Sequence, residues 1–228
     1  MGFYGNLLRL KIEQMRGIER PPPDAIDERP LGIRIGGRLA IPEAPFIIAG
    51  DALSMTKPDD GIVVGHGVTK GADGAIVHRI HVGDDAMIWI AGKKGADFSN
   101  PATIDECMAM RRVALIRPTT PGEWNDWLDS ETGHLGNPVI VAPNGVQYGR
   151  LWIPGDERSE PISLKEDFRD ADGRRTRLHS AMLFARDVET PAGTIAEYLL
   201  VSAIDDDGKD DFIEIHLGID ATPGMIAA

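Results

Sequence analysis

The sequence predicts a mainly β protein: an antiparallel β-sandwich or open barrel with two or three short helices and an N-terminal helical arm. Two observations predict this α+β fold class. Strand-like runs rich in Val, Ile and Leu recur about every 8–12 residues, separated by turns rich in Gly, Asn and Asp, which is typical of sandwiches and barrels. Signals for helix starts are few by comparison, and each opens only a short segment.

The first 29 residues form the predicted arm and its linker. Residues 3–19 have apolar side chains near helical spacing, so we expect an amphipathic helix there. Residues 20–24, RPPPD, end this helix and form a stiff linker. The arm is a candidate docking element, which could pack on its own domain or a sister subunit of a homo-oligomer, bind a protein partner, or contact a membrane peripherally. Its docking side chains would be Phe3, Leu7, Leu8 and Met15.

Residues 30–228 form the predicted β-rich domain. Strands at 61–70 and 75–82 flank a Gly-Ala-Asp-Gly turn and predict a β-hairpin, with a further strand at 86–91. The end of the chain predicts a three-stranded meander, with strands at 176–188, 196–204 and 212–219. Strand-rich segments lie on both sides of residues 118–136, so the domain could divide there into two β sub-lobes.

Two capping boxes predict the short helices. Thr120-Pro121-Gly122-Glu123 places Thr at the N-cap, Pro at the first helical position and Glu at the third, and it opens a helix that carries Trp124 and Trp127 on one face. Thr103-Ile104-Asp105-Glu106 repeats the pattern before an apolar run, so a second helix start is expected there.

The segment 138–164 carries the most distinctive pattern. Asn144-Gly145 suits the tight turn of a hairpin, because both residues tolerate positive φ. In the strand that follows, Tyr148, Arg150 and Trp152 share one face, so the arginine can stack between two aromatic rings. The pattern is compatible with a recognition surface that also includes Arg158 and Glu160, or with a cation–π ladder that closes the edge of a core.

The same segment resembles a bacterial family, the YjfK-like proteins, which are a domain of unknown function. The resemblance covers about residues 30–220 and is carried by Gly145-x-x-Tyr148-x-Arg150-x-Trp152, Pro154-Gly155, Glu160-Pro161-Ile162-x-Leu164, Pro30–Gly37, Glu123-Trp124-x-x-Trp127-Leu128 and Glu197–Ala203. It implies no catalytic residues. Members are often encoded near PspA-like membrane-stress proteins and glutathionylspermidine-synthetase-like ligases, which implies an accessory role by association.

Composition narrows the class of protein. The formal net charge of −12 argues against nucleic-acid binding, which needs a basic surface. Charged residues interrupt the apolar stretch at the start of the chain, so no signal peptide is expected. Cys107 is the single cysteine and lies in an apolar run, which favours a buried, inert thiol in a reducing cytoplasm.

Two clusters invite a metal hypothesis. If the predicted hairpin forms, His66 lies near His78 or His81, but these two histidines point to opposite faces and no third ligand is evident. The acidic run Asp205–Asp211, followed by Glu214, partly matches a calcium loop, although strands flank it and a solvated hairpin tip explains it equally well. We therefore expect no metal and no cofactor.

No catalytic motif is present in the sequence. The sequence therefore favours a non-enzymatic, cytoplasmic accessory or interaction protein, linked to PspA-like membrane-stress systems, that engages a protein partner through its arm or its Tyr148/Arg150/Trp152 face. The alternative is a small-ligand-binding module or an enzyme that acts on a polyamine or a peptide, which would require a deep pocket lined by perturbed carboxylates or by the region of His66.

Overall fold

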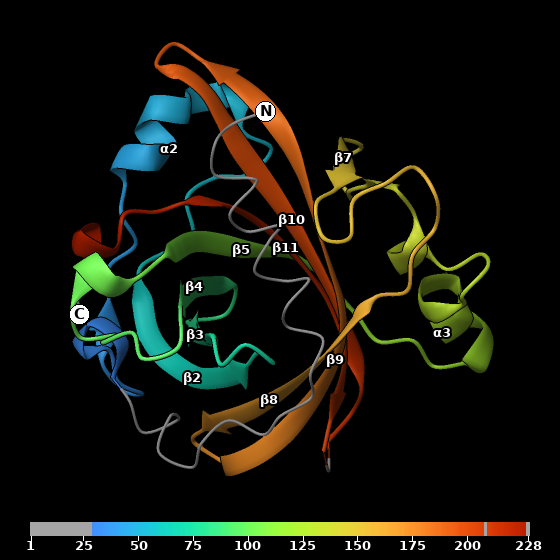
Figure 1. Ribbon diagram of the computed structural model, residues 1–228, viewed down its shortest axis with the longest axis horizontal. Coiled ribbons are helices and arrows are strands. Elements are labelled where there is room, and N and C mark those ends of the chain that lie inside the picture. Colours follow the sequence, from blue (N-terminus) through green and yellow to red (C-terminus); the bar gives the residue numbers. More distant parts are fainter. Residues whose placement is uncertain (1–28, 208, 227–228) are drawn as a thin grey trace.

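The computed structural model describes residues 29–207 and 209–226, and within these ranges it shows an antiparallel β-barrel with a short sheet extension and two α-helices (Figure 1). The helices are α2, Ala44–Ala49, and α3, Pro121–Leu128. The strands are β1 Arg38–Leu39, β2 Gly61–Lys70, β3 Ile76–Val82, β4 Ala86–Gly92, β5 Glu106–Ile116, β6 Val139–Val141, β7 Gln147–Arg150, β8 Ile162–Asp170, β9 Gly173–Thr190, β10 Gly193–Asp206 and β11 Phe212–Asp220.

The barrel is closed, where the sequence predicted a sandwich or an open barrel. Eight strands follow one another around it in the order β2, β3, β4, β5, β11, β10, β9 and β8. The ring closes because β8 also pairs with β2, with Gly65 opposite Asp170 and Thr69 opposite Glu166. Every neighbouring pair is antiparallel, so no strand of the ring leaves a free edge along its paired length.

Most of the predicted strands are confirmed. The hairpin of β2 and β3, the strand β4 and the meander β9–β10–β11 lie where turn signals and alternating side chains placed them. The meander strands are longer than predicted, and β9 extends from Gly173 to Thr190. Strands from both sides of residues 118–136 join the same barrel.

One predicted helix start is confirmed and the other is wrong. Thr120 and Glu123 form the expected capping box at the start of α3, since the Glu123 amide donates to Thr120 Oγ1 and the Glu123 carboxylate accepts from the Thr120 amide, each at 3.3 Å. After Thr103, by contrast, the chain forms strand β5. This segment pairs with β4 on one edge and with β11 on the other, and these ladders override the local capping signal.

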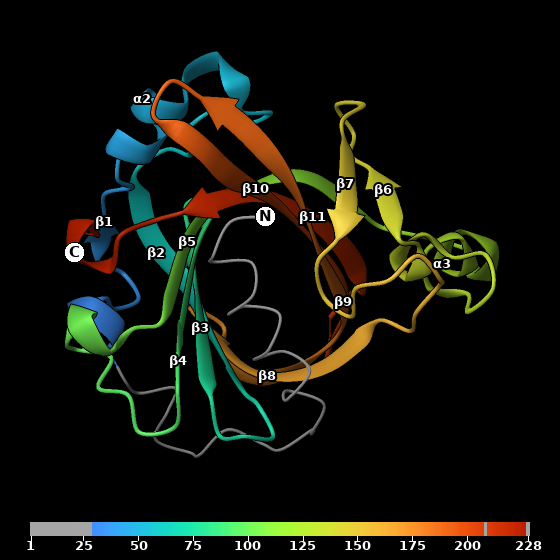
Figure 2. The same ribbon diagram turned by 45° about the horizontal axis from the view of Figure 1, so that its top comes forward.

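The sheet continues beyond the barrel on one side. Past its pairing with β8, strand β9 pairs with β7, and β7 pairs with β6, so this hairpin stands outside the ring next to α3 (Figure 2). Asn144-Gly145 makes the turn between β6 and β7, with Gly145 at φ +83°, which confirms the predicted hairpin.

Two apolar clusters hold the barrel. One covers its outer face along β2–β5, where Ile33, Leu39 and Phe98 pack on Ile80 and Ile88. The other includes side chains inside the barrel such as Trp89 and Met110. Cys107 belongs to the outer cluster, and burial raises the pKa of its thiol to about 12, as expected for an inert cysteine. The predicted helical arm, with Phe3, Leu7, Leu8 and Met15, lies outside the described residues.

Candidate functional site

The inside of the barrel is polar at one end. Side chains alternate along each strand, so every second residue points inward. Toward one end most of the inward residues are apolar, and they include Trp89, Met108 and Leu200. Toward the other end, where β2, β9 and β11 begin, the inward positions carry charged, imidazole and aromatic side chains from the five strands β3, β5, β8, β9 and β11. We call this end the mouth.

A buried ionic cluster separates the two halves. Glu166 is 0% exposed; its Oε1 accepts from Arg79 Nη1 at 3.2 Å and its Oε2 accepts from His179 Nε2 at 3.1 Å. Burial alone would raise the pKa of Glu166, but the Arg79 charge and the His179 contact outweigh it and hold that pKa well below its usual range. The carboxylate fits because Gly67 on the neighbouring strand β2 has no side chain; a Cβ there would come within 2.0 Å of Glu166 Oε1.

A second ionic layer lies nearer the mouth. Arg177 donates to Asp206 at 2.9 Å, and Arg175 pairs with both Asp206 at 2.6 Å and Asp170 at 2.9 Å. The guanidinium carbon of Arg177 lies 3.4 Å from the centre of the Phe168 ring, so the cation is stacked as well as paired. Arg177 is held rigidly by these contacts and is only 8% exposed.

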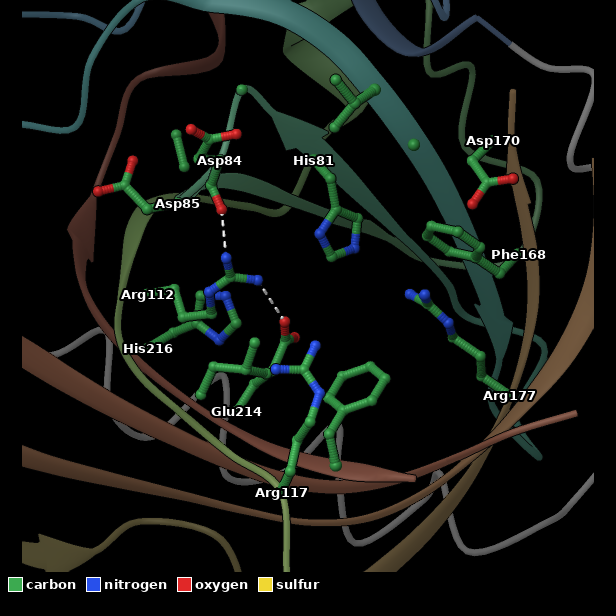
Figure 3. A pocket seen from close by; sticks show the side chains of 16 residues that line it. His81, Asp84, Asp85, Arg112, Arg117, Phe168, Asp170, Arg177, Glu214 and His216 are labelled. Carbon is green, nitrogen blue, oxygen red and sulfur yellow. Dashed lines mark hydrogen bonds and ion pairs between the residues drawn. The ribbon is translucent and has the colours of Figure 1, made fainter. Parts of the chain in front are cut away.

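An open cavity of about 280 Å³ occupies the mouth, and we call it the mouth cavity. Figure 3 shows His81, Arg117 and Arg177 pointing toward its centre from three different parts of the barrel wall. Arg112 also lines it, donating to Glu214 Oε1 at 2.8 Å and to the backbone carbonyl of Asp84. Further wall residues are Val64, Asp85, Leu115, Phe168, Asp170, Phe212 and His216.

Several buried nitrogens at the mouth have no hydrogen-bond partner among the described residues: Arg177 Nε, His81 Nε2 and His216 Nδ1. Burial lowers the pKa of His81 to about 4 and also lowers the pKa of His216, so both imidazoles are neutral at pH 7. Unpartnered buried polar groups cost free energy, so this arrangement is expected to be completed by water or by a ligand.

A much smaller chamber lies directly below the mouth cavity. Its volume of about 10 Å³ is close to the least that one water molecule needs. Arg79, Glu166, His179 and Ser202 line it, and it shares His81, Arg177 and His216 with the mouth cavity. Arg79 Nε and Nη2 also lack hydrogen-bond partners within the described part of the chain. Unpartnered hydrogen-bond donors therefore occur both at the mouth and at the ionic cluster below it.

The predicted recognition face is not on the surface. Tyr148 is 0%, Trp152 2% and Arg150 9% exposed, so these side chains are core rather than a docking surface. The expected stack is also wrong, because β7 ends at Arg150 and the chain bends at Trp152 and Ile153. Arg150 instead donates to four backbone carbonyls, those of Gly136, Ile153, Gly155 and Glu157.

The other two predicted surface residues differ from each other. Arg158 folds back onto the segment before β6 and donates to the carbonyls of Asp129, Ser130 and Gly133. Glu160 is exposed. The ring that does contact a cation is Tyr148: the Arg186 guanidinium lies 5.8 Å from it, and both side chains bind the buried carboxylate of Glu197, at 2.9 and 2.7 Å.

The two metal hypotheses gain no third ligand. His66 Nε2 lies 2.9 Å from His78 Nδ1 on the outer face of the barrel, while His81 points inward, as the alternation predicted. In the acidic run, Asp206 turns inward to Arg175 and Arg177, and Glu214 lies inside the barrel beside Arg112. No group of three or more His, Cys, Asp or Glu side chains suited to a metal ion occurs within the described ranges.

Sequence reasoning missed the mouth, although a signal for it exists. Three strands repeat charged or aromatic residues at every second position: Arg79-x-His81, Arg175-x-Arg177-x-His179 and Phe212-x-Glu214-x-His216. In an ordinary strand such a row faces solvent. Here the intervening residues Ile80, Ile213 and Ile215 are buried, so both faces of β3 and β11 are covered, whereas in β9 the intervening Leu178 is exposed. Two well-covered faces with one polar row indicate a polar interior.

Comparison with known proteins places the chain in a family. Residues 9–227 match the family model described as "Protein of unknown function (DUF2491)". The chain belongs to this family. The match confirms the expected membership of a family of unknown function, under this description rather than the YjfK-like name. No curated protein and no solved structure gave a significant match. None of the described helices is long and apolar enough to span a membrane.

Proposed function

We propose that this protein is a ligand-binding barrel, which holds a small polar molecule in the mouth cavity. The observation that carries the proposal is the convergence of unpartnered buried nitrogens on an open cavity of about 280 Å³. Eight-stranded barrels have interiors wide enough to hold one small ligand, and a concave site with a few convergent polar groups is the usual form of a ligand site.

The free-energy cost of burying charged side chains inside the barrel supports the proposal. The apolar half shows that the same barrel can be filled with side chains such as Trp89, Met108 and Met110. Burying charges is less favourable than such packing, even when the charges are paired. A polar half that opens to solvent therefore fits a binding role better than a purely structural one.

A binding role is compatible with the accessory role that the sequence predicts, because a binding protein needs no catalytic group. Support for that role through the Tyr148/Arg150/Trp152 face is lost with the burial of these residues. Three expectations from the sequence remain proposals: a protein partner bound through the predicted arm, a location in the cytoplasm argued from the single cysteine and the charged start of the chain, and a link to PspA-like systems that rests on the resemblance.

The test is a thermal-shift screen of the full chain against small anions, polyamines and neutral polar metabolites, with native mass spectrometry of the protein as purified. Leu115→Trp should fill the mouth cavity, because Leu115 lies on its wall. Leu178→Trp is the matched control, since Leu178 is 46% exposed outside the cavity.

We expect at least one compound class to raise the melting temperature of the wild type and of Leu178→Trp but not of Leu115→Trp. Absence of any stabilising compound in all three classes, or equal binding by Leu115→Trp, would overturn the proposal.

A further inference from the structure

The carboxylates at the mouth are already paired with cations. Glu214 binds Arg112 at 2.8 Å, Asp85 binds Arg111 at 2.8 Å, and Asp170 binds Arg175 at 2.9 Å. In the described part of the wall, only Asp84 has a carboxylate with no hydrogen bond or ion pair to another residue, and it lies exposed on the turn between β3 and β4. A cationic ligand would therefore find few free acceptors in the cavity.

The free groups of the cavity are mostly donors. Arg117 makes no ion pair or hydrogen bond with any described residue, yet its side chain points into the cavity (Figure 3). Arg177 Nε, a group that can only donate, is likewise unpartnered inside the described structure. His81 and His216 each add one unpartnered ring nitrogen, which donates in one tautomer. Groups that only accept and carry negative charge satisfy such donors best.

The remaining wall is apolar and aromatic. Phe212 and Leu115 line the cavity, and Phe168 lies behind Arg177. The volume of about 280 Å³ lies at the lower end of the range of about 300–1,000 Å³ that is usual for ligand pockets, so the occupant must be small. A bare inorganic ion would leave the apolar wall in contact with water only.

We infer that the mouth cavity takes a small organic anion whose carboxylate or phosphate group faces Arg117 and Arg177, with its carbon skeleton against Phe212 and Leu115. This inference rests on the proposed ligand-binding function and names the class of ligand. Arg177 is the rigid anchor, because Asp206 and Phe168 fix its guanidinium. Arg117 is the adaptable partner, and it reaches the cavity from another part of the wall (Figure 3). The sequence suggested a polyamine, which is a cation, as an alternative ligand; the inference replaces it with an anion.

Titration calorimetry at constant ionic strength tests the inference, with benzoate, succinate, phenyl phosphate, inorganic phosphate, spermidine and a neutral sugar as probes. The variant is Arg117→Gln, since Arg117 is exposed and holds no other described residue in place. Arg117→Lys keeps the charge and loses the fork of donors. Arg29→Gln, which removes an exposed arginine outside the cavity wall, is the matched control.

We expect an organic anion to bind the wild type and the Arg29→Gln control with equal affinity. Its affinity for Arg117→Gln should be about tenfold lower, as for the loss of one charge-assisted hydrogen bond, and its affinity for Arg117→Lys should be intermediate. Preference for benzoate and succinate would identify a carboxylate ligand, and preference for phenyl phosphate a phosphate ester. Either preference supports the inference.

Three results would overturn it: spermidine or the sugar binds and no anion does, inorganic phosphate binds as tightly as the organic anions, or anion binding is the same in Arg117→Gln as in the wild type. In the first case a ligand-binding barrel would stand with a different ligand. If no probe binds and the broader screen also finds nothing, the proposed function itself fails.

Discussion

At the scale of single residues, Glu166 is the side chain on which the barrel interior depends most. It lies at the centre of the barrel, and it balances the charge of Arg79, which is 3% exposed. A buried ion pair adds little net stability, but removing one partner leaves the other charge uncompensated in a medium of low dielectric. The interior therefore tolerates this pair only as a complete unit.

Glu166→Gln should lower the free energy of unfolding by about 3–5 kcal/mol, because it leaves Arg79 without its carboxylate. Urea denaturation followed by tryptophan fluorescence measures the change. Glu160→Gln is the control: Glu160 is exposed, and we expect a change within about 0.5 kcal/mol. A loss below about 1 kcal/mol in Glu166→Gln would show that another carboxylate compensates Arg79.

At the scale of elements, strand β2 leaves room inside the barrel because two of its inward positions are glycines without side chains. Gly65 and Gly67 pair with Asp170 and Phe168 of the neighbouring strand β8, and the space that a side chain on them would take is occupied by Phe168 and Glu166. A Cβ at Gly65 would lie 2.6 Å from Phe168 Cζ, and one at Gly67 would lie 2.0 Å from Glu166 Oε1. These two glycines make room for the aromatic platform and for the buried carboxylate.

Gly67→Ala should destabilise the protein by about 1–3 kcal/mol, because the added methyl group displaces the Glu166 carboxylate. Gly149→Ala in strand β7 is the matched control. Its Cβ would meet only the Ala185 carbonyl oxygen at 3.9 Å, so we expect no loss, or a gain of up to about 1 kcal/mol from the stiffer unfolded chain. Thermal and urea unfolding of both variants check the difference in sign.

Local signals predicted the elements well and their partners poorly. The Asn144-Gly145 turn and the Thr120–Glu123 capping box depend on neighbouring residues, and both are confirmed. The helix expected after Thr103 is wrong, because this segment pairs with β4 and with β11, and β11 lies about 100 residues further along the chain. The closure of the barrel and the site at its mouth depend on the pairing of β2 with β8, which no local pattern encodes.

At the scale of the whole molecule, the barrel buries several histidines, and burial keeps their imidazoles uncharged. Burial lowers the pKa of His66 to about 3 and that of His81 to about 4, and it also lowers the pKa values of His179 and His216. In the unfolded chain each histidine binds a proton below about pH 6.5. Below that pH the unfolded state binds more protons, so stability falls as the pH falls.

Asp220 acts in the opposite direction. Asp220 is exposed at the end of β11, but desolvation of its carboxyl beside Tyr198 raises its pKa to about 6, so between about pH 6 and 4 the folded state binds this proton more readily than the unfolded chain. His66 and His81, which stay neutral in the folded state down to pH 5, each cost about 1.4 kcal/mol per pH unit below 6.5, and one carboxyl cannot offset both of them. The free energy of unfolding should therefore be lower at pH 5 than at pH 7.5 by about 3 kcal/mol or more.

Urea denaturation across this pH range measures the slope. The slope gives the number of protons that the protein takes up on unfolding. His81→Gln should lower this number by about one, while His134→Asn, at an exposed position, should leave it unchanged. A flat profile between pH 7.5 and 5 would contradict the neutral state of the buried histidines.

The pairing of β2 with β8 also has a kinetic consequence. It joins residues about 100 positions apart in the chain, such as Gly65 and Asp170, so the loop-closure entropy must be overcome before these contacts form. The hairpin β2–β3 and the meander β9–β11 use neighbouring segments and can form first. Until the ring closes, β2 and β8 each present an open edge. Refolding should therefore be slow and concentration-sensitive, with edge-to-edge association between molecules competing against closure within one.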